Sequence, residues 1–150
     1  MNDEYLRLDN QLCFLFYSVS RAMTRMYGPL LSELGLTYPQ YLVMLILWET
    51  DSVEVSRITE LLHIDTGTVS PMLKRLESAG LLRRRRSAED ERRVMVSLTA
   101  KGAGLREKAV KVPSELFCRT GFTMEEYGQL KKQLSGLLQR MESAPSCDSG

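Results

Sequence analysis

The stretch from Ser56 to Leu98 places the tightest constraint on the fold, because helical and β-strand patterns follow one another in it in a fixed order. A short amphipathic helix is followed by a turn at His63–Thr68 and by a second helix that should stop at Gly80. Two β-prone runs, 81–86 and 93–98, then flank the charged loop SAEDE. This order of helix, turn, helix and hairpin predicts a winged helix-turn-helix, an arrangement that binds duplex DNA.

The charge distribution favours the same interpretation. Between Lys74 and Lys101, nine Lys and Arg residues stand against four Asp and Glu residues, although the whole chain carries a net charge of only +1. Such a local excess of positive charge is expected of a phosphate-binding surface. The arginine run 83–86 could also be a solvated strand edge, but alternate residues of a strand share a face, so two of these arginines should face out together. From helix and hairpin we expect DNA contacts by Thr66, Thr68, Ser70, Lys74, Arg75, Arg84 and Arg86.

The start of the second helix is open between two positions. In one, the helix begins at Asp65 or Thr66 and encloses Pro71. In the other, Ser70 is the capping residue and Pro71 is the first helical residue. Either start clusters hydroxyl side chains at the helix N-terminus, which is the end presented to bases and phosphates.

Helical periodicity also covers the N-terminal part of the chain. A first helix is expected from about Leu6 to Leu34, with a bend near Pro29 and an end before Gly35. Its apolar residues are too many for one narrow stripe, so it needs partners on more than one side, and a second copy of the chain is the simplest additional partner. A helix from about Tyr38 to Glu49 should open with a capping box and be buried, because it is apolar on all sides.

The remaining elements follow from local signals. Ser52–Glu54 can add a third strand before the helix at Val55–Leu62. After the hairpin, a long helix from about Ala100 to Thr120 should kink at Pro113. A capping box at Thr123–Glu126 should then start a last helix that ends near residue 141.

Together these elements predict a mainly α fold with a small β-hairpin, a winged helix-turn-helix held in a helical homodimer. One domain should span residues 1–150, with dimerisation helices at about 6–34 and 100–141, a DNA-binding unit at about 52–98 and a disordered tail at about 143–150. A two-fold dimer would place two reading helices in successive major grooves of an inverted repeat, about 34 Å apart.

Composition argues against several other classes. The polar, acidic start contains no signal peptide and no apolar run is long enough to span a bilayer, so we expect a cytoplasmic protein without membrane association. Three distant cysteines, Cys13, Cys118 and Cys147, do not resemble a secreted disulfide framework. With one histidine, His63, and no close Cys/His spacing, neither a metal site nor a cofactor is expected. The chain shows no βαβ pattern and no CxxC motif, which argues against a thiol peroxidase, so we expect no enzyme.

Four segments carry a resemblance to a known family. They are LDNQLCFLFYSVSRAMTRMYGPLL, LGLTYPQYLVMLILWE, DTGTVSPMLKRLESAGLL and DERRVMVSLTAKG. Together they resemble the organic-hydroperoxide-sensing branch (OhrR) of the MarR repressors, closely from about Leu6 to Lys101 and more loosely in the terminal helices. The NQLCF and TYPQY segments are the specific part, because the winged-helix features alone would indicate only the broader family.

The resemblance implies a homodimeric repressor that leaves its operator when an organic hydroperoxide oxidises a thiol. The sensing thiolate corresponds to Cys13. The tyrosine hydroxyls that hydrogen-bond its sulfur correspond to Tyr27 and Tyr38, with Tyr17 contributed across the dimer.

The resemblance also implies roles in the wing and in a terminal helix. The Asp90 carboxylate would hold the wing loop and Arg92 would enter the minor groove. Cys118 corresponds to a second cysteine that, in some members, resolves the oxidised thiol by an intersubunit disulfide. In other members a free low-molecular-weight thiol does so.

Each of these residues also has a structural interpretation. Cys13 could be a small buried core residue, although its position early in a helix would favour a negative charge. The tyrosines could be interface or core aromatics, Cys118 could be an inert helix residue, and Cys147 is expected to have no role. The alternative function is therefore a MarR-type repressor that a non-covalent phenolic or aromatic ligand releases, with Cys13 structural.

Overall fold

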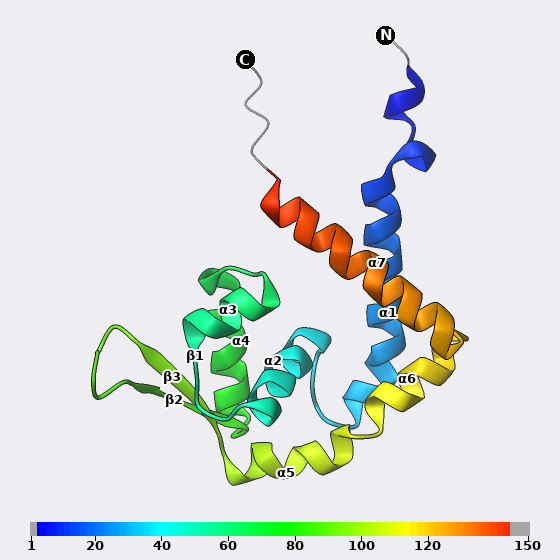
Figure 1. Ribbon diagram of the computed structural model, residues 1–150. Coiled ribbons are helices and arrows are strands. Elements are labelled where there is room, and N and C mark those ends of the chain that lie inside the picture. Colours follow the sequence, from blue (N-terminus) through cyan, green and yellow to red (C-terminus); the bar gives the residue numbers. More distant parts are fainter. Residues whose placement is uncertain (1–2, 145–150) are drawn as a thin grey trace, which may run out of the picture. The chain divides into compact units, whose positions relative to one another are not determined.

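The computed structural model describes residues 3–144 of the chain, which forms two compact units, Met1–Pro113 and Ser114–Gly150. Two short 3-10 turns, Asp3–Leu6 and Leu8–Asn10, precede the first long helix (Figure 1). The helices are α1 (Leu12–Ser32), α2 (Tyr38–Glu49), α3 (Val55–Leu62), α4 (Thr66–Ser78), α5 (Ala100–Ala109), α6 (Val112–Thr120) and α7 (Met124–Ser143). The strands are β1 (Val53–Glu54), β2 (Leu82–Arg86) and β3 (Val94–Leu98).

The three strands form one antiparallel sheet in the order β1-β3-β2. β3 is the central strand, and its Val96 lies opposite Val53 on one side and Arg84 on the other. The hairpin of β2 and β3 projects away from α2, α3 and α4 (Figure 1). The predicted winged helix-turn-helix, including its short third strand, is therefore confirmed.

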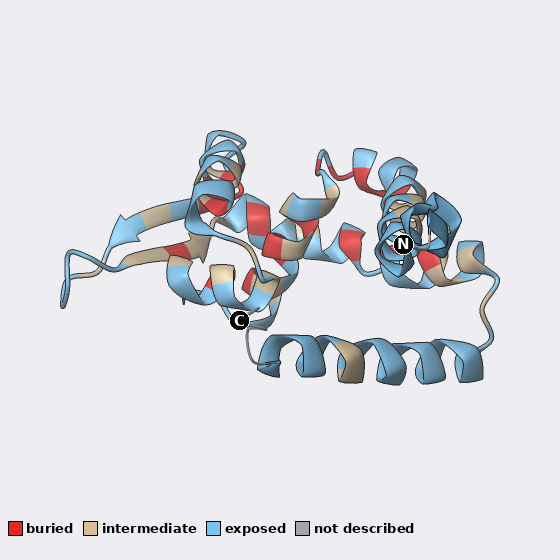
Figure 2. Ribbon diagram, turned by 90° about the horizontal axis from the view of Figure 1, so that it is seen from above, coloured by how far each residue is buried: buried red, intermediate tan, exposed pale blue. Residues whose placement is uncertain are grey.

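The core of the first unit joins the winged region to α2. Figure 2 shows buried stretches of ribbon in red within these elements. Their fully buried side chains include Val43, Met44, Leu47, Ile58, Val69, Leu73, Leu76, Leu82 and Val96. The expectation that α2 is buried on all sides is wrong for Leu45, whose side chain is 40% exposed. This face of α2 lines an open cavity rather than packing against another element.

The first helix differs from its predicted bounds at the start. Residues 3–10 form the two 3-10 turns instead of an α-helix, and α1 begins at Leu12. Pro29 lies inside α1 without ending it, because it falls in the last turn, where the bond that it removes is the only one lost. The predicted end before Gly35 is confirmed, since α1 stops at Ser32 and Gly35 adopts a φ of +66°.

The predicted kinked helix from residue 100 to residue 120 is wrong, because it is two helices. α5 ends at Ala109 and α6 begins at Val112. A proline at position 113 cannot donate to the carbonyl of Ala109, and the break one turn upstream places Pro113 in the first turn of α6, where no donor is needed.

α7 lies in the second unit and begins with the predicted capping box. The backbone N–H of Thr123 donates to Glu126 Oε2 (2.8 Å), and the backbone N–H of Glu126 donates to Thr123 Oγ1 (3.2 Å). These bonds hold the pKa of Glu126 below its ordinary value. The predicted disordered tail falls mostly on residues 145–150, outside the described part of the chain.

Two helices expose long apolar surfaces. The first half of α1 exposes Leu12, Phe14, Leu15, Phe16, Tyr17 and Val19, and α7 exposes Met124, Tyr127, Leu130, Leu134, Leu138 and Met141. Among residues 3–144, no helix combines the length and the apolar character that crossing a membrane requires.

A close contact between α5 and Leu81, just before β2, requires glycine at position 102. The Gly102 carbonyl accepts a hydrogen bond from Trp48 Nε1 (2.9 Å), and a Cβ at Gly102 would collide with the carbonyl oxygen of Leu81. We expect Gly102→Ala to lower the free energy of unfolding by at least about 2 kcal/mol, because backbone must move to admit the methyl group.

Gly104 is the matched control, since it lies in the same helix with open space around its Cα. Gly104→Ala should be neutral or stabilising by up to about 1 kcal/mol. Urea unfolding of both variants at one protein concentration measures the difference. Equal stabilities of the two variants would contradict the close contact.

Candidate nucleic-acid interface and cysteine sites

The N-terminus of α4 is capped by Asp65, which decides where this helix starts. The backbone N–H of Thr68 donates to Asp65 Oδ1 (2.9 Å), and the Thr68 hydroxyl donates to Asp65 Oδ2 (2.9 Å). The start at Thr66 with Pro71 inside the helix is therefore confirmed, and the alternative start at Ser70 is wrong. The bonds from the side chain and the backbone of Thr68 hold the pKa of Asp65 below its ordinary value.

α4 separates its apolar and polar residues cleanly. Val69, Leu73 and Leu76 are buried against the rest of the first unit. The predicted contact residues Thr66, Thr68, Lys74 and Arg75 are exposed, and Ser70 is half-buried. The structure thus brings the hydroxyl groups of the helix start and the two cations onto the accessible side of α4.

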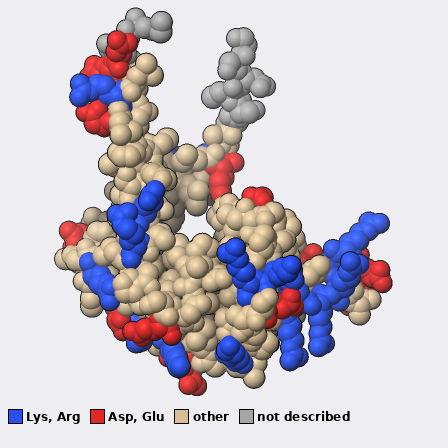
Figure 3. All heavy atoms as spheres, turned by 180° about the vertical axis from the view of Figure 1, so that it is seen from behind, with Lys and Arg blue, Asp and Glu red and all other residues tan. Residues whose placement is uncertain are grey.

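The wing arginines fall into two groups, those that form an ion pair within the protein and those that do not. Arg84 is in the first group. Arg84 makes an ion pair with Glu77 at 2.8 Å, and Arg93 makes one with Glu54 at 2.8 Å. The sequence predicts a DNA contact by Arg84 together with Arg86, but the guanidinium of Arg84 is turned back towards Glu77 of α4. Within residues 3–144, the arginines of the wing that form no ion pair are Arg83, Arg85, Arg86 and Arg92. Figure 3 shows Lys and Arg side chains gathered around the projecting hairpin.

The tip of the wing is closed by short-range hydrogen bonds. Asp90 Oδ1 accepts from the backbone N–H of Arg92 (3.0 Å), and the Asp90 carbonyl accepts from the N–H of Arg93 (3.0 Å). The N–H of Ser87 donates to the Arg93 carbonyl (2.8 Å) and closes the loop at its base. Arg92 is left exposed at the tip, with its backbone held and its guanidinium accessible.

Cys13 is a free, exposed thiol in the first turn of α1. Tyr17 lies one helical turn later, so the two side chains project from the same face of α1. Arg21 follows one turn further on; its guanidinium donates to the Tyr17 hydroxyl (2.7 Å) and its Cζ lies 5.4 Å from the centre of the Tyr17 ring. Within one chain, Tyr17 is therefore the tyrosine that lies beside Cys13 along the helix.

Tyr27 and Tyr38 form a separate aromatic cluster with Tyr41. The ring centres of Tyr27 and Tyr38 are 4.7 Å apart, and those of Tyr27 and Tyr41 are 5.8 Å apart. Burial raises the pKa of the Tyr38 hydroxyl above its ordinary value, so this group remains a proton donor at neutral pH.

The helix geometry corrects the predicted division of the tyrosines between subunits. Cys13 and Tyr27 are 14 residues apart in the continuous helix α1, which corresponds to about 21 Å along its axis. Tyr27 and its neighbour Tyr38 therefore cannot reach the sulfur of their own chain, whereas Tyr17 lies beside it. If all three hydroxyls surround one sulfur, Tyr27 and Tyr38 must come from the other subunit, the reverse of the expected arrangement.

Cys118 is also a free, exposed thiol, and it lies in α6 within the second unit. Because Cys13 belongs to the first unit, the pairing of the two sulfurs remains a prediction. Cys147 lies outside the described residues. In residues 3–144, no group of three or more His, Cys, Asp or Glu side chains could hold a metal ion.

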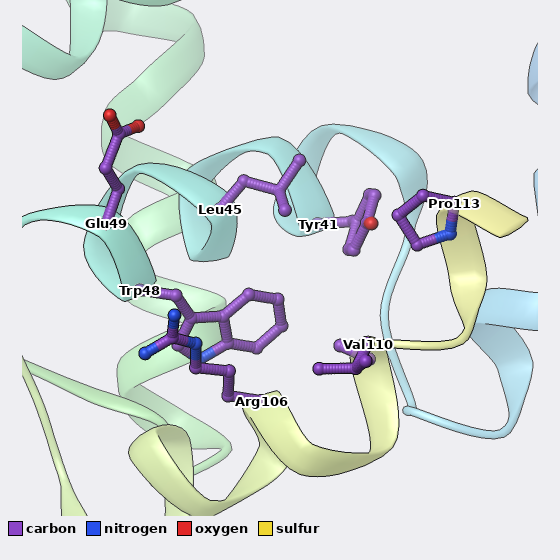
Figure 4. A pocket seen from close by; sticks show the side chains of 8 residues that line it. Tyr41, Leu45, Trp48, Glu49, Arg106, Val110 and Pro113 are labelled. Atoms are coloured by element: carbon purple, nitrogen blue, oxygen red, sulfur yellow. The ribbon is translucent and has the colours of Figure 1, made fainter.

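An open cavity between α2 and α5 was not foreseen from the sequence. Its volume is about 460 Å³, and it is lined by Tyr41, Leu45, Trp48, Glu49, Arg106, Ala109, Val110 and Pro113 (Figure 4). Figure 4 shows the rings of Tyr41 and Trp48 and the guanidinium of Arg106 around the opening. These residues come from two segments far apart in the chain, so only their packing could reveal the cavity.

Comparison with known proteins places this geometry in a family. The profile of the family described as "Transcriptional regulator SarA/Rot" matches residues 25–109. The organic hydroperoxide resistance transcriptional regulator of Bacillus subtilis (strain 168) is 49% identical over 138 residues, which cover 92% of this chain and 94% of that protein. The chain belongs to the MarR family of transcriptional regulators.

Solved structures agree with this assignment to the MarR family. Reduced AbfR bound to DNA is 36% identical and superposes with a TM-score of 0.79, covering 95% of this chain and 98% of that one. A mutant of MarR from E. coli complexed with operator DNA is 27% identical, with a TM-score of 0.77 and coverage of 85% and 93%. This MarR-family chain is thus a transcriptional regulator of the OhrR/MarR type, and the family and the mainly helical winged-helix fold expected from its sequence are confirmed.

The Asp65 cap predicts a pH dependence of stability. Because the native pKa of Asp65 is lowered, the cap stabilises the fold fully above the ordinary pKa of 3.8 and loses this effect as the pH falls through the native pKa. Asn accepts the same bond from Thr68 at every pH, so Asp65→Asn should gain stability relative to the wild type on acidification. Urea unfolding of both proteins between about pH 7 and pH 3 measures this change. A difference that does not vary with pH would contradict the assigned cap.

Proposed function

We propose that this MarR-family protein is a homodimeric repressor that senses organic hydroperoxides through Cys13 and then releases its operator. The observation that carries the proposal is the free thiol of Cys13, exposed in the first turn of α1 with Tyr17 one turn away. The 49% identity to a regulator named for organic hydroperoxide resistance supports the choice of stimulus. Cytoplasmic location and the absence of catalytic turnover belong to the same proposal.

The DNA-binding half of the proposal rests on α4 and the wing. An inverted-repeat duplex would meet Thr66, Thr68, Lys74 and Arg75 of α4 in the major groove, with Ser70 near the helix start. Arg86 and Arg92 have accessible guanidinium groups for phosphate and minor-groove contacts. The related AbfR, whose reduced form has been solved with DNA, supports this assignment.

The exposed apolar faces of α1 and α7 support the homodimer. Leu12, Leu15 and Phe16 on α1 and Leu130 and Leu134 on α7 are exposed in the single chain. Contiguous apolar surface of this kind marks an interface, and a two-fold dimer would bury it. We therefore assign dimerisation to the predicted segments 6–34 and 100–141, and DNA binding to segment 52–98.

The sensing chemistry follows from an accessible thiolate. The sulfur anion of Cys13 attacks the terminal oxygen of the hydroperoxide, the O–O bond breaks, and the products are a sulfenic acid and the corresponding alcohol once the alkoxide takes up a proton. A second thiol, either Cys118 of the partner subunit or a free low-molecular-weight thiol, then displaces the sulfenic hydroxyl as water and leaves a disulfide.

The surroundings assigned to Cys13 favour this reaction. The helix N-terminus stabilises a negative sulfur. Tyr27 and Tyr38 of the partner subunit would donate hydrogen bonds to the sulfur, since Tyr27 of its own chain lies too far along α1 and Tyr38 of its own chain packs beside that Tyr27. A hundredfold loss of DNA affinity requires the oxidised form to prefer the released arrangement by about 2.8 kcal/mol, which a rearranged interface can supply.

Cys13→Ser tests the sensing thiol. The variant should bind DNA as tightly as the wild type, because Cys13 lies on α1 outside the reading surface, and should remain bound when an organic hydroperoxide is added. Fluorescence anisotropy with labelled operator duplex, before and after oxidant, measures both properties. Release of this variant by peroxide, at the rate of the wild type, would refute the thiol switch.

Cys118→Ser tests the resolving thiol, with Cys147→Ser as its control. If Cys118 resolves the sulfenic acid, the wild type and Cys147→Ser should form a peroxide-dependent covalent dimer on non-reducing electrophoresis, and Cys118→Ser should not. If an external thiol resolves it, Cys118→Ser should still be released when a small thiol is supplied with the peroxide.

The cavity between α2 and α5 favours a second candidate function, release by a non-covalent aromatic ligand. Tyr41 and Trp48 offer ring surfaces and Arg106 offers a partner for an anionic group, which together suit an aromatic carboxylate. Trp48 is the single tryptophan of the chain, so its fluorescence reports directly on the cavity.

Titration with an aromatic carboxylate such as salicylate distinguishes the two candidates. Under the second candidate, salicylate should quench Trp48 fluorescence, release DNA without oxidant, and do both at least about tenfold more weakly with Arg106→Gln, which loses a charge-assisted hydrogen bond. Release that requires peroxide and is reversed by a thiol reductant would reject the second candidate.

A further inference from the structure

One carboxylate connects the reading helix to the wing. Glu77 Oε1 accepts from the backbone N–H of Arg84 (2.9 Å), and Glu77 Oε2 accepts from Arg84 Nε (2.9 Å) and Nη2 (2.8 Å). The side chains are only 35% and 30% exposed, so the pair is partly shielded from water. Three hydrogen bonds from one residue to both oxygens of a carboxylate hold the partners at a defined distance and angle more firmly than a single surface ion pair does.

The position of the pair makes it a brace between two DNA-binding elements. Glu77 lies in the last turn of α4, and Arg84 is the central residue of β2. Arg84 lies opposite Val96, which is fully buried, so its side chain is on the core-facing side of the sheet. The chain between the two elements is short and turns at Gly80, whose φ is +73°.

The second strand of the wing has its own anchor. Arg93, beside the start of β3, donates to Glu54 of β1 through Nε (2.9 Å), and its Nη2 lies 2.8 Å from the same carboxylate oxygen. Arg84 and Arg93 thus each bind a carboxylate of the protein, one at each strand of the hairpin. The other arginines of the wing keep their guanidinium groups for an external anion.

A projecting hairpin amplifies small movements at its base. The tip lies about five residues beyond Arg84, or about 15 Å at the rise of a β-strand. A tilt of about 10° at Arg84 would therefore displace the tip, which carries Arg92, by nearly 3 Å. A shift of that size breaks a hydrogen bond to a phosphate or a base.

We propose that Glu77 is a positioning residue for DNA binding, which acts by holding Arg84 and so setting the angle between the wing and α4. Arg84 then has no phosphate contact of its own. This inference rests on the proposed binding of DNA, and adds to it which cations of the wing contact the duplex and which support those that do.

The proposal predicts a sign opposite to that of simple electrostatics. Removing a negative charge close to a DNA-binding surface should strengthen binding, since the carboxylate repels phosphate. If Glu77 positions the wing, its removal should weaken binding instead. Glu91 is the matched control, because it is an exposed acid of the same wing with no ion pair in the part of the chain that the structure describes.

The experiment measures the affinity of full-length variants for a duplex that the wild type selects from a random-sequence pool, by fluorescence anisotropy at several salt concentrations. We expect Glu77→Gln and Arg84→Gln each to lose at least about tenfold in affinity. The double variant should bind no more weakly than the single variant with the lower affinity, because both changes break the same contact. Glu91→Gln should bind at least as tightly as the wild type. The salt dependence of Arg84→Gln should match that of the wild type, because no phosphate contact is lost.

Several outcomes would overturn the proposal. One is binding by Glu77→Gln as tight as that of the wild type, another is additive losses in the double variant, and a third is a shallower salt dependence for Arg84→Gln. Failure of the wild type to select any duplex would instead reject the proposed function, so the two failures are distinguishable.

Arg84→Lys separates positioning from a general loss of stability. Lysine keeps the charge but cannot donate the pair of hydrogen bonds that the guanidinium donates to Glu77, so this variant should bind DNA as weakly as Arg84→Gln. Wild-type affinity of a folded Arg84→Lys variant would show that charge alone matters, which would overturn the proposal. Urea unfolding of each variant shows that affinities are compared between folded proteins.

Discussion

The burial of one face of α4 is the constraint on which the rest of this structure depends. Val69, Leu73 and Leu76 recur at helical spacing and are almost completely excluded from water. Because these side chains must pack against α2, α3 and the sheet, the rotation of α4 about its axis is determined, and its hydroxyl groups and cations face outwards. The polar and cationic face of α4, which we propose meets DNA, is thus a consequence of core packing, and the Asp65 cap determines where α4 begins.

The wing shows how like charges can be crowded together without opposing the fold. Six arginines lie in and beside the two strands, and two of them, Arg84 and Arg93, are neutralised by carboxylates from elements outside the hairpin. Glu77 lies seven residues from Arg84 and Glu54 lies 39 residues from Arg93, and each pair joins the hairpin to another element. Under the proposed function, these two arginines support the wing and do not contact DNA. Which arginines are paired within the protein and which stay accessible depends on which guanidinium groups lie within reach of Glu77 and Glu54.

The cysteine site depends on a different constraint, the rigidity of a long helix. α1 places Tyr17 beside Cys13 and carries Tyr27 about 21 Å away, so a single chain cannot gather all the groups that the family resemblance assigns to one sulfur. The exposed apolar side chains around Cys13 indicate that a second chain covers this surface. Under the proposed function, sensing and dimerisation would then depend on the same interface, and oxidation of one sulfur would act on both reading helices through it.

Local patterns in the sequence determined the elements of the winged region, the capping boxes and the separation of apolar from charged residues, because each depends on neighbours within a few positions. They failed where a choice depends on how separate elements pack against one another. Pattern alone assigned Arg84 to DNA, whereas the packing of β2 beside α4 brought Glu77 within hydrogen-bond distance. The family resemblance placed Tyr27 and Tyr38 at the sulfur of their own chain, which the length of α1 does not allow. No local pattern could reveal the cavity beside Trp48 and Arg106. The sequence by itself therefore determined which elements form and which family they belong to, and only the tertiary structure decided which charges are paired and which rings can meet, because those contacts depend on the packing between elements.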